Sequence, residues 1–471
     1  MIDLYPHQEE LLERVRGAMR RKIKRPLIVL PTGGGKTRIA TKICAASIER
    51  DFLPVWFMVH RRELLDQSAQ AFCDAGLPVG IVARGHDIEG SKPLQVVLID
   101  SLPRRLHYLP TPRVVIPDEA HHCVAPKWSR VQDLYPDAFY IGLTATPQRL
   151  DGRGLGTHFD EIVEGQNMRW LIDNGYLADY KIFAPPPTTL DLSQVGHVAG
   201  EFNKHQMNEA VAKSTIVGDS IAEYRKHAMG KRCLIRSVGV EASAATAEAF
   251  RAAGFVAVHL DAKTPDQERR RLFADFRRGE ITHLCNVDLF GEGVDIPGVE
   301  CLIDNRPTES LTFFLQFIGR MLRPAPGKTH GIYLDQVGNT MRHGMPDEVR
   351  PWTLDGKRKK KKTAAVFTCK VCYGAFARPF RYCPECGAIT VGWATSRAEP
   401  ERVAGELHEL NADLLAKSRY GKPRKPFDPA RGRARTLEEL VRYGVEHGYE
   451  KPERWANHVF AARQSKKRAR G

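Results

Sequence analysis

Short apolar runs alternate with amphipathic stretches along the first 345 residues of the chain. The runs are rich in Val, Ile and Leu, which is typical of buried strands, and stretches such as Glu63–Ala75 and Gln267–Arg278 have helical spacing. Strands that alternate with helices predict parallel sheets covered on both faces. The expected strands are Pro26–Leu30, Pro54–Val59, Leu94–Ile99, Val114–Ile116, Phe139–Leu143, Cys233–Ile235, Val256–Leu260, His283–Val287, Cys301–Ile303 and Gly331–Leu334.

This alternation stops near the middle of the chain. Pro185-Pro186-Pro187 and the polar residues as far as Ser214 interrupt it, and 471 residues are too many for one core. We therefore expect an α/β fold with two tandem domains, a small cysteine-containing module and a basic tail. The predicted boundaries are 1–165 for the first domain, 166–215 for a connection, 216–345 for the second domain, 346–366 for a basic linker, 367–392 for the cysteine module and 393–471 for a basic, partly helical tail.

Composition places the chain among ordinary globular proteins, with 42% hydrophobic and 27% charged residues. No apolar run approaches the roughly 20 residues of a membrane span. The first residues, Met1-Ile2-Asp3-Leu4-Tyr5, lack the basic and then apolar pattern of a secretory leader. A cytoplasmic location is the expectation.

The net charge of +15 is concentrated in the last quarter of the chain. Residues 346–471 contain 28 Lys and Arg against 15 Asp and Glu, whereas the first 345 residues are close to neutral. A basic region beside a neutral body indicates a polyanionic partner, most often nucleic acid. A tail that only aids solubility is the alternative.

Ten cysteines fall into two groups. Four have the spacing C-x₂-C-x₁₀-C-x₂-C, which is typical of a tetrahedral structural zinc site; a pair of disulfides is the alternative, disfavoured inside a cell. Four protein ligands leave no position for catalysis, so the metal is expected to fold the module. The four are Cys369, Cys372, Cys383 and Cys386, and the six expected to be reduced core residues are Cys44, Cys73, Cys123, Cys233, Cys285 and Cys301.

A glycine-rich loop, Pro31-Thr32-Gly33-Gly34-Gly35-Lys36-Thr37, lies between an expected strand and an expected helix. Such a loop points backbone N–H groups inward and adds a helix N-terminus, which suits a polyphosphate. Lys36 would reach the β- and γ-phosphates and the Thr37 hydroxyl would bind Mg²⁺. The strict phosphate-loop pattern requires Gly where this chain has Leu30, so an ordinary glycine-rich turn is the alternative for this segment alone.

Two further motifs follow strands in the first half of the chain. Asp118-Glu119-Ala120-His121 follows Val114–Ile116, at the carboxyl end where α/β sheets bind ligands. Asp118 would hold Mg²⁺ and Glu119 would polarise the attacking water. Gly142–Pro147 offers two threonine hydroxyls that could link the nucleotide site to the second domain.

The second half contributes two more motifs. Gly291–Pro297 follows the expected strand His283–Val287, and Gln316–Pro324 places Arg320 and Arg323 on one helical face. Guanidinium groups directed at a γ-phosphate stabilise the transition state of its transfer. A surface helix whose arginines pair with carboxylates is the alternative for such a pair in isolation.

Taken in order, these motifs over about residues 1–340 resemble those of the superfamily 2 helicases with a DEAH box. The resemblance implies two tandem RecA-like domains, and the P-T-G-x-G-K-T form of that family accounts for Leu30. The residues implied to bind ATP and Mg²⁺ are Gln8, as the reader of adenine, Thr32, Gly33, Gly34, Gly35, Lys36, Thr37, Asp118, Gly293 and Asp295. The residues implied to act in hydrolysis are Lys36, Asp118, Glu119, Gln316, Arg320 and Arg323. The residues implied to couple the nucleotide site to the second domain are His121, Thr144 and Thr146. The residues implied to contact nucleic acid are Arg61, Ser101 and Asn286.

The layout is most similar to RadD-like bacterial and UvsW-like phage DNA helicases. The cysteine module and the segment Gly448–Ala456 favour the RadD-like kind. One position departs from the family, because Arg236 lies in Leu234–Val238 where relatives carry a more apolar strand end. A role for Ser237 stays open.

The function implied is an ATP-dependent DNA helicase or translocase in replication, recombination or repair, encoded by a bacterium or a phage. ATP would bind between the domains, and single-stranded, forked or branched DNA would be held mainly through its phosphates. The zinc module and tail would add DNA affinity or bind a replication or repair protein. The alternatives are the motor subunit of a restriction or nuclease complex, an RNA helicase, and a scaffold without catalysis.

Overall fold

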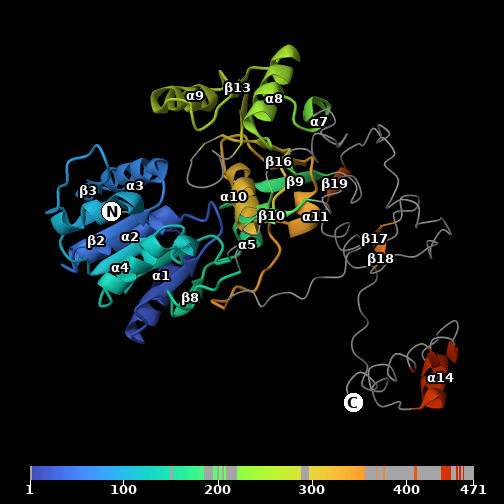
Figure 1. Cartoon of the computed structure of the whole chain (residues 1–471), viewed down its shortest axis with the longest axis horizontal. Helices are drawn as coiled ribbons and strands as arrows, with labels where there is room; N and C mark the ends of the chain where they lie inside the picture. The colour runs from blue at the N-terminus through green and yellow to red at the C-terminus, as the bar shows by residue number, and fades with distance from the viewer. Residues whose placement is uncertain are drawn as a thin grey trace. The chain divides into compact units, whose positions relative to one another are not determined.

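The computed structural model describes most of the first 355 residues and short pieces beyond them. The larger compact unit lies within residues 1–415 and a smaller one within residues 416–471. The larger unit contains two main sheets with their helices, here termed the first and second lobes (Figure 1). The described residues are 3–148, 152–184, 195–198, 201–203, 206–207, 220–287, 296, 298–355, 367–368, 375–376, 408–410, 436–446, 452–453, 456–457 and 460.

The first lobe confirms the predicted alternation of strands and helices. Its strands pair in the orders β3-β4-β2-β5-β6 and β7-β1-β8, all parallel, and a parallel bridge between Asp118 and Leu143 joins the two sets. Its elements are α1 (Pro6–Arg20), β1 (Pro26–Val29), α2 (Lys36–Glu49), β2 (Val55–Val59), α3 (Arg62–Asp74), β3 (Val79–Val82), β4 (Leu94–Leu98), the 3₁₀ turns Ile99–Arg104, Leu106–Tyr108 and Ala120–His122, β5 (Val114–Pro117), α4 (Pro126–Leu134), β6 (Phe139–Tyr140), β7 (Gly142–Thr144) and β8 (Glu161–Glu164).

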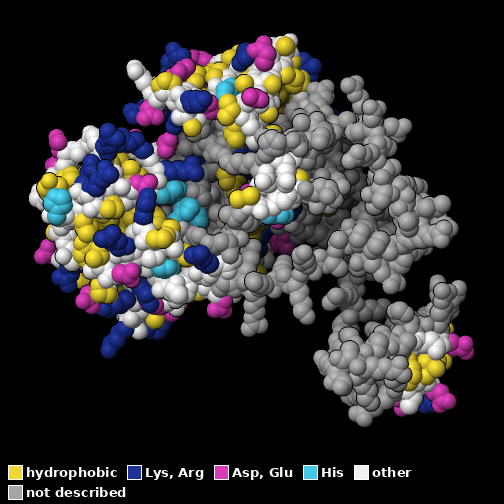
Figure 2. All heavy atoms as spheres, viewed as in Figure 1, with side chains coloured by type: hydrophobic (Ala, Val, Ile, Leu, Met, Phe, Trp, Pro, Cys, Tyr) yellow, Lys and Arg dark blue, Asp and Glu magenta, His cyan; other side chains and the backbone are white. Residues whose placement is uncertain are grey.

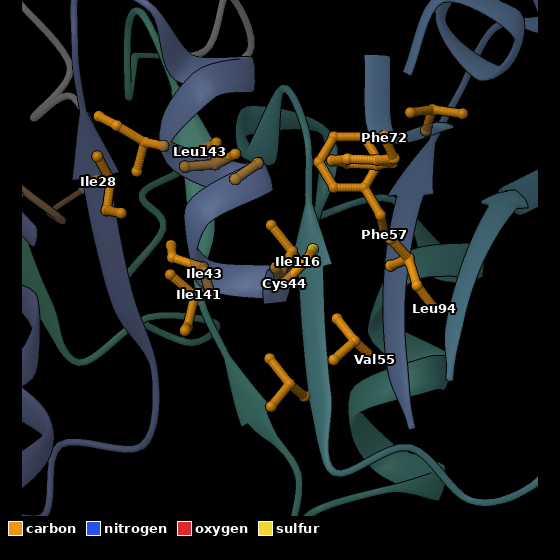
Figure 3. Close-up of a cluster of buried hydrophobic side chains, with 14 of the residues drawn as sticks. Ile28, Ile43, Cys44, Val55, Phe57, Phe72, Leu94, Ile116, Ile141 and Leu143 are labelled. Atoms are coloured by element: carbon orange, nitrogen blue, oxygen red, sulfur yellow. The ribbon is translucent and has the colours of Figure 1, made fainter. Parts of the chain in front are cut away.

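Both faces of the first sheet are buried, as β2 illustrates. Val55, Phe57 and Val59 belong to one buried cluster, which includes side chains of α1, α2 and α3, whereas Trp56 and Met58 belong to a second cluster. Figure 3 shows side chains of the first cluster between the strands and the helices. Because successive side chains of a strand point to opposite faces, a strand between two layers must be apolar throughout.

The second lobe is also a parallel sheet, in the order β13-β14-β12-β15-β16-β9, with β19 antiparallel at the β9 edge. Short antiparallel pairs are formed by β10 with β11 and by β17 with β18. The elements are α5 (Met168–Asp173), β9 (Asp179–Ala184), β10 (His197–Val198), β11 (Glu201–Phe202), α7 (Ser220–His227), β12 (Cys233–Arg236), α8 (Val240–Ala252), β13 (Ala257–His259), α9 (Asp266–Arg278), β14 (His283–Asn286), β15 (Cys301–Asp304), α10 (Leu311–Met321), β16 (His330–Asp335), α11 (Asn339–His343), β17 (Phe367–Thr368), β18 (Ala375–Phe376) and β19 (His408–Leu410).

Strand β9 comes from the segment that the sequence marked as a connection. It pairs in parallel with β16, and its residues Ile182 and Phe183 are buried in the two cores of the second lobe. The chain therefore joins the second sheet before the Pro-rich segment, whose residues 185–194 lie outside the described residues.

The scattered cysteines follow the prediction with one exception. All six are free thiols and five are buried, but Cys73 is exposed on α3. The four cysteines expected to bind zinc lie outside the described residues, although β17 and β18 flank the stretch that contains Cys369 and Cys372. In the smaller unit, α14 (Leu437–Glu446) buries Leu440. Among the described residues, no helix is both long and apolar enough to cross a bilayer.

Candidate active site

The glycine-rich loop joins β1 to α2, and Lys36 is the first residue of that helix. Gly33 and Gly35 have φ values of +86° and +92°, a region that glycine adopts without strain. Space is also limited: a Cβ on Gly33 would lie 2.7 Å from Leu177 Cδ2, and one on Gly35 would lie 2.3 Å from Gln8 Nε2. The backbone conformation therefore requires glycine at both positions, and Gly35 is at the N-terminal end of α2, where anions are stabilised.

Gln8 holds this loop from the side of α1. Its side chain is buried, Nε2 donates to the Gly34 carbonyl at 3.0 Å, and Oε1 accepts from the Tyr5 N–H at 3.1 Å. Both ends of the amide are thus engaged within the protein. The implied role of Gln8 in reading adenine stays a prediction.

Two carboxylates lie beyond β5, near the lysine of the loop. Lys36 Nζ is 3.8 Å from Glu119 Oε1, and both side chains are largely buried. Glu119 has φ +49°, a conformation that non-glycine residues seldom adopt and that is concentrated at functional sites. Burial and the adjacent Glu119 carboxylate raise the pKa of Asp118 to about 6, against the opposing effect of Lys36.

Buried polar atoms at the site suit a polyphosphate with a cation. Thr32 Oγ1 and both amide atoms of Gln316 have no hydrogen-bond partner within the described part of the chain, although buried polar groups are normally paired. Thr37 and Asp118 supply the oxygen ligands that Mg²⁺ prefers and line a groove of about 790 Å³. The residues present therefore fit the nucleotide and the metal that the sequence predicted.

The raised pKa of Asp118 predicts an acid limb in the pH profile. The pKa of Asp118 is about 6 in the folded chain and 3.8 in the unfolded chain, so the protonated carboxyl favours the folded state. This contribution to the free energy of unfolding is complete below pH 3.8 and is lost as the pH rises through about 6. Cation binding needs the charged form, so kcat/KM for MgATP is expected to fall about tenfold per pH unit below about pH 6. Steady-state ATP hydrolysis from about pH 5 to 8 measures this, and a profile that stays flat to pH 5 would contradict it.

Helix α10 of the second lobe lies directly against the phosphate loop. A Cβ on Gly319 would be 2.5 Å from the Cβ of Thr32, so only glycine permits this approach. Gln316 and Arg320 are buried on the same side of the helix. Arg323 lies just past the end of α10, and burial lowers the pKa of its guanidinium to about 10, which leaves it charged at neutral pH.

A series of side-chain contacts begins at Glu119 in the first lobe. His121 Nδ1 is 3.4 Å from Glu119 Oε2 and 3.2 Å from Thr144 Oγ1. The Thr144 hydroxyl donates to the Thr146 carbonyl at 3.0 Å, which leaves His121 Nδ1 as the donor to Thr144. The structure thus brings together the three residues expected to couple the site to the second lobe.

The series continues into α10. Thr146 Oγ1 donates to Thr312 Oγ1 at 2.8 Å, and the Thr312 hydroxyl donates to the Gln148 carbonyl at 3.1 Å. Thr312 lies one helical turn before Gln316, on the same helix as Arg320. The sequence offered no signal for Thr312 beyond this spacing, because its partners are more than 160 residues away.

The residues expected to contact nucleic acid differ in their exposure. Arg61 precedes α3 and is partly exposed, in a region where Lys and Arg side chains gather around α3 (Figure 2). Ser101 is 8% exposed. Asn286 is fully buried at the end of β14, and its Nδ2 donates to the Ile235 carbonyl at 3.1 Å; its contact with nucleic acid stays a prediction. Gly293 and Asp295 lie outside the described residues.

Two sequence families match the two lobes. The family described as type III restriction enzyme, res subunit, matches residues 1–149. The helicase conserved C-terminal domain family matches residues 213–325.

Curated relatives extend these matches across the chain. A 51.5 kDa protein of a Lactococcus phage (isolate 7-9) is 34% identical over 87% of this chain and 89% of its own length. A Saccharomyces cerevisiae protein described as the ATP-dependent helicase IRC3 is 28% identical over 71% of this chain, which spans about half (51%) of that protein. The DNA 3'-5' translocase XPB2 of Sulfurisphaera tokodaii is 26% identical over 64% of this chain and 75% of its own length. With a family match over each lobe and helicases among these relatives, the chain belongs to the superfamily 2 helicases.

Proposed function

We infer that the chain is an ATP-dependent DNA helicase or translocase that hydrolyses ATP between its two lobes. The observation that carries this proposal is the contact of α10 with the phosphate loop, where Gly319 lies against Thr32. Arg320 follows Gly319 on the same helix and is buried, which supports its proposed role at the anion-binding loop. A site completed from two lobes ties hydrolysis to their relative movement, which is how a motor converts ATP turnover into motion.

Each side chain of the site has a role in this proposal. Lys36 and the loop backbone hold the β- and γ-phosphates, while Thr37 and Asp118 hold the cation. Glu119 orients and deprotonates the attacking water. Bound Mg²⁺ supplies charge neutralisation at the phosphate oxygens. Arg320 and Arg323 stabilise negative charge on the transferred group, so hydrolysis requires the second lobe.

The contacts from Glu119 to Thr312 provide a path for coupling. A shift of Glu119 on hydrolysis alters its contact with His121, and the hydroxyls of Thr144, Thr146 and Thr312 extend this contact to α10. Because α10 carries Arg320 and is followed by Arg323, the nucleotide state biases how the second lobe docks. The proposed coupling is therefore local, and it consists of one side-chain contact, between Glu119 and His121, followed by named hydrogen bonds.

DNA is the proposed nucleic acid, held chiefly through its phosphates by residues such as Arg61 near α3. The XPB2 translocase and the restriction-enzyme family among the matches support DNA over RNA. Phosphate contacts carry no sequence information, so binding is expected to tolerate any sequence and to weaken with salt. The Lactococcus phage relative supports a phage or bacterial origin, and hence action in the cytoplasm on replication, recombination or repair intermediates.

Strand displacement tests this proposal. The experiment measures the release of a labelled strand from three substrates, a forked DNA, a blunt DNA duplex and a forked RNA. Each is measured at one salt concentration, with ATP or with a nonhydrolysable analogue. The proposal expects ATP-dependent release from forked DNA. Release from RNA alone would overturn the choice of DNA, and the absence of release or of ATP-driven translocation on any substrate would overturn the proposal.

A motor subunit of a restriction or nuclease complex is the second candidate. The match of residues 1–149 to a restriction-enzyme subunit favours it, but that match covers the first lobe alone. Co-purification with a nuclease or methyltransferase subunit would support it, whereas ATP-dependent strand displacement by the purified chain would favour an autonomous helicase. A scaffold without catalysis is disfavoured because the lysine and the carboxylate proposed for hydrolysis lie together, with Lys36 Nζ 3.8 Å from Glu119 Oε1.

We propose a structural zinc site in the cysteine module, supported by the C-x₂-C-x₁₀-C-x₂-C spacing and by the paired strands β17 and β18 around its first half. Purified chain is expected to contain about one zinc per molecule by elemental analysis, and Cys372→Ser to lose most of it. Cys73→Ser, at the exposed cysteine of α3, is the matched control and should keep the metal. Equal zinc content in the two variants would contradict the site.

The basic tail is proposed to add phosphate contacts. Removal of residues 357–471 is expected to weaken DNA binding and to reduce the salt dependence of the affinity, since each phosphate neutralised contributes about 0.9 to the slope of log K against log salt. Replacement of the six residues Lys357–Lys362 by Gln separates the charge run from the rest of the tail. A slope unchanged in both variants would show that the tail does not touch phosphate.

A further inference from the structure

Arg236, the residue at which the chain departs from the family pattern, is buried in the second lobe. It is the last residue of β12 and 1% exposed. An arginine in such a position costs free energy unless its charge and its hydrogen bonds are all satisfied. The structure satisfies them through a partner on the adjacent strand.

That partner is Asp304, which is aligned with Arg236 in the register of β12 and β15. Arg236 Nε is 2.7 Å from Asp304 Oδ1 and Nη2 is 2.5 Å from Oδ2, a bidentate pair. The carboxylate also accepts from Tyr333 Oη at 2.7 Å and from Asn339 Nδ2 at 2.9 Å. Donors from β12, β16 and α11 therefore converge on one buried carboxylate, which fixes the plane of the guanidinium.

The guanidinium then contacts helix α10. Arg236 Cζ lies 4.5 Å from the centroid of the Phe313 ring and 4.9 Å from that of Phe317. These rings are one turn apart on α10, so a single planar cation is packed against two successive turns. A lysine in this position could not supply both the bidentate pair and the flat stacking surface.

The same helix presents its other side to the first lobe. Thr312 bonds to Thr146, and Gly319 abuts Thr32. At about 100° per residue, Gly319 lies about 140° around the helix from the mean direction of the two phenylalanines, Gln316 about 80° and Arg320 about 40°. Contacts on two flanks fix both the position of α10 and its rotation about its axis.

We propose that Arg236 is a positioning residue for hydrolysis, which sets the rotation of α10 and thereby aims Arg320 at the phosphate loop. This inference rests on the proposed ATPase function and adds a residue that touches neither nucleotide nor nucleic acid. An apolar side chain could fill the same volume, and buried ion pairs are often no more stabilising than such a replacement. The ion pair differs in one respect: it gives the rings a fixed, flat partner, which specifies one rotation of the helix.

The test compares Arg236→Lys with the matched control Arg251→Lys, an ion-paired arginine of α8 in the same lobe. For Arg236→Lys we expect kcat for ATP to fall about tenfold or more while KM and the affinity for a fluorescent nucleotide stay within about twofold. Lys36 and Thr37 are on the other lobe, so the binding site is preserved. The control should match the wild type. Circular dichroism and thermal melting monitor the fold.

A double-mutant cycle with Arg320→Ala gives the decisive readout. If Arg236 acts through Arg320, adding Arg236→Lys to Arg320→Ala leaves kcat unchanged. An equal further loss in that background, or a lower melting temperature with wild-type kcat, would overturn the inference. Should Arg236→Lys not fold, Phe313→Leu, which removes the stacked ring but leaves the ion pair, is expected to give the same pattern. A wild-type chain without ATP turnover would instead refute the proposed function.

Discussion

Substitution of Glu119 by Gln is expected to lower ATP turnover about a thousandfold while nucleotide binding persists. A positioned general base typically contributes about 10²- to 10⁴-fold. Gln keeps the size of the side chain, but it cannot take a proton from water and it removes the charge 3.8 Å from Lys36 Nζ. Steady-state hydrolysis and the affinity for a fluorescent nucleotide together separate the loss of chemistry from a loss of binding.

Two further variants define this experiment. Glu89→Gln replaces an exposed glutamate that pairs with Lys92 and should hydrolyse ATP as the wild type does. Lys36→Ala should lose both turnover and tight binding, because Lys36 is proposed to contact the phosphates directly. Substantial turnover in both Glu119→Gln and Lys36→Ala would refute the assignment of this site.

Replacement of Arg320 by Ala is expected to lower kcat by about a thousandfold or more, with ATP still bound. Arginines that reach a phosphoryl transition state from a second domain contribute about 10³- to 10⁵-fold. Arg320 is 4% exposed on α10, whose Gly319 touches the loop at Thr32, whereas the binding residues belong to the first lobe. The phosphate loop alone should therefore bind ATP but hydrolyse it poorly.

The matched control is Arg278→Ala, an exposed arginine of α9 that pairs with Asp275 and Glu280. Its kcat should equal that of the wild type. Single-turnover hydrolysis with excess protein measures the chemical step without product release. A normal single-turnover rate in Arg320→Ala would mean that the second lobe does not complete the site.

Local sequence signals predicted the alternation of the fold and the first-lobe half of the site. The phosphate loop could be predicted because its glycines, its lysine and the preceding apolar strand are contiguous. Asp118 and Glu119 could be predicted because they follow a strand, and parallel strands gather their carboxyl ends at one edge. These features depend on residues close together in sequence, where periodicity and residue type carry the information.

Features that depend on distant partners could not be predicted. The partner of Arg236 is 68 residues away and that of Thr146 is 166 residues away, so neither pair has a local pattern. Likewise, the hydrogen bond from the Asn286 amide to the Ile235 carbonyl joins residues 51 positions apart. The predicted strand Phe139–Leu143 is divided into β6, which pairs with β5, and β7, which pairs with β1. Tertiary pairing determines such outcomes.

Whether the chain is a DNA-dependent motor is decided by its rate of ATP hydrolysis. The rate is measured with the purified chain at one salt concentration, without nucleic acid and with single-stranded DNA, forked DNA or RNA. We expect DNA to stimulate turnover at least several-fold and Glu119→Gln to abolish the stimulated rate. A rate that no nucleic acid changes, or a DNA-stimulated rate that survives in Glu119→Gln, would contradict this expectation.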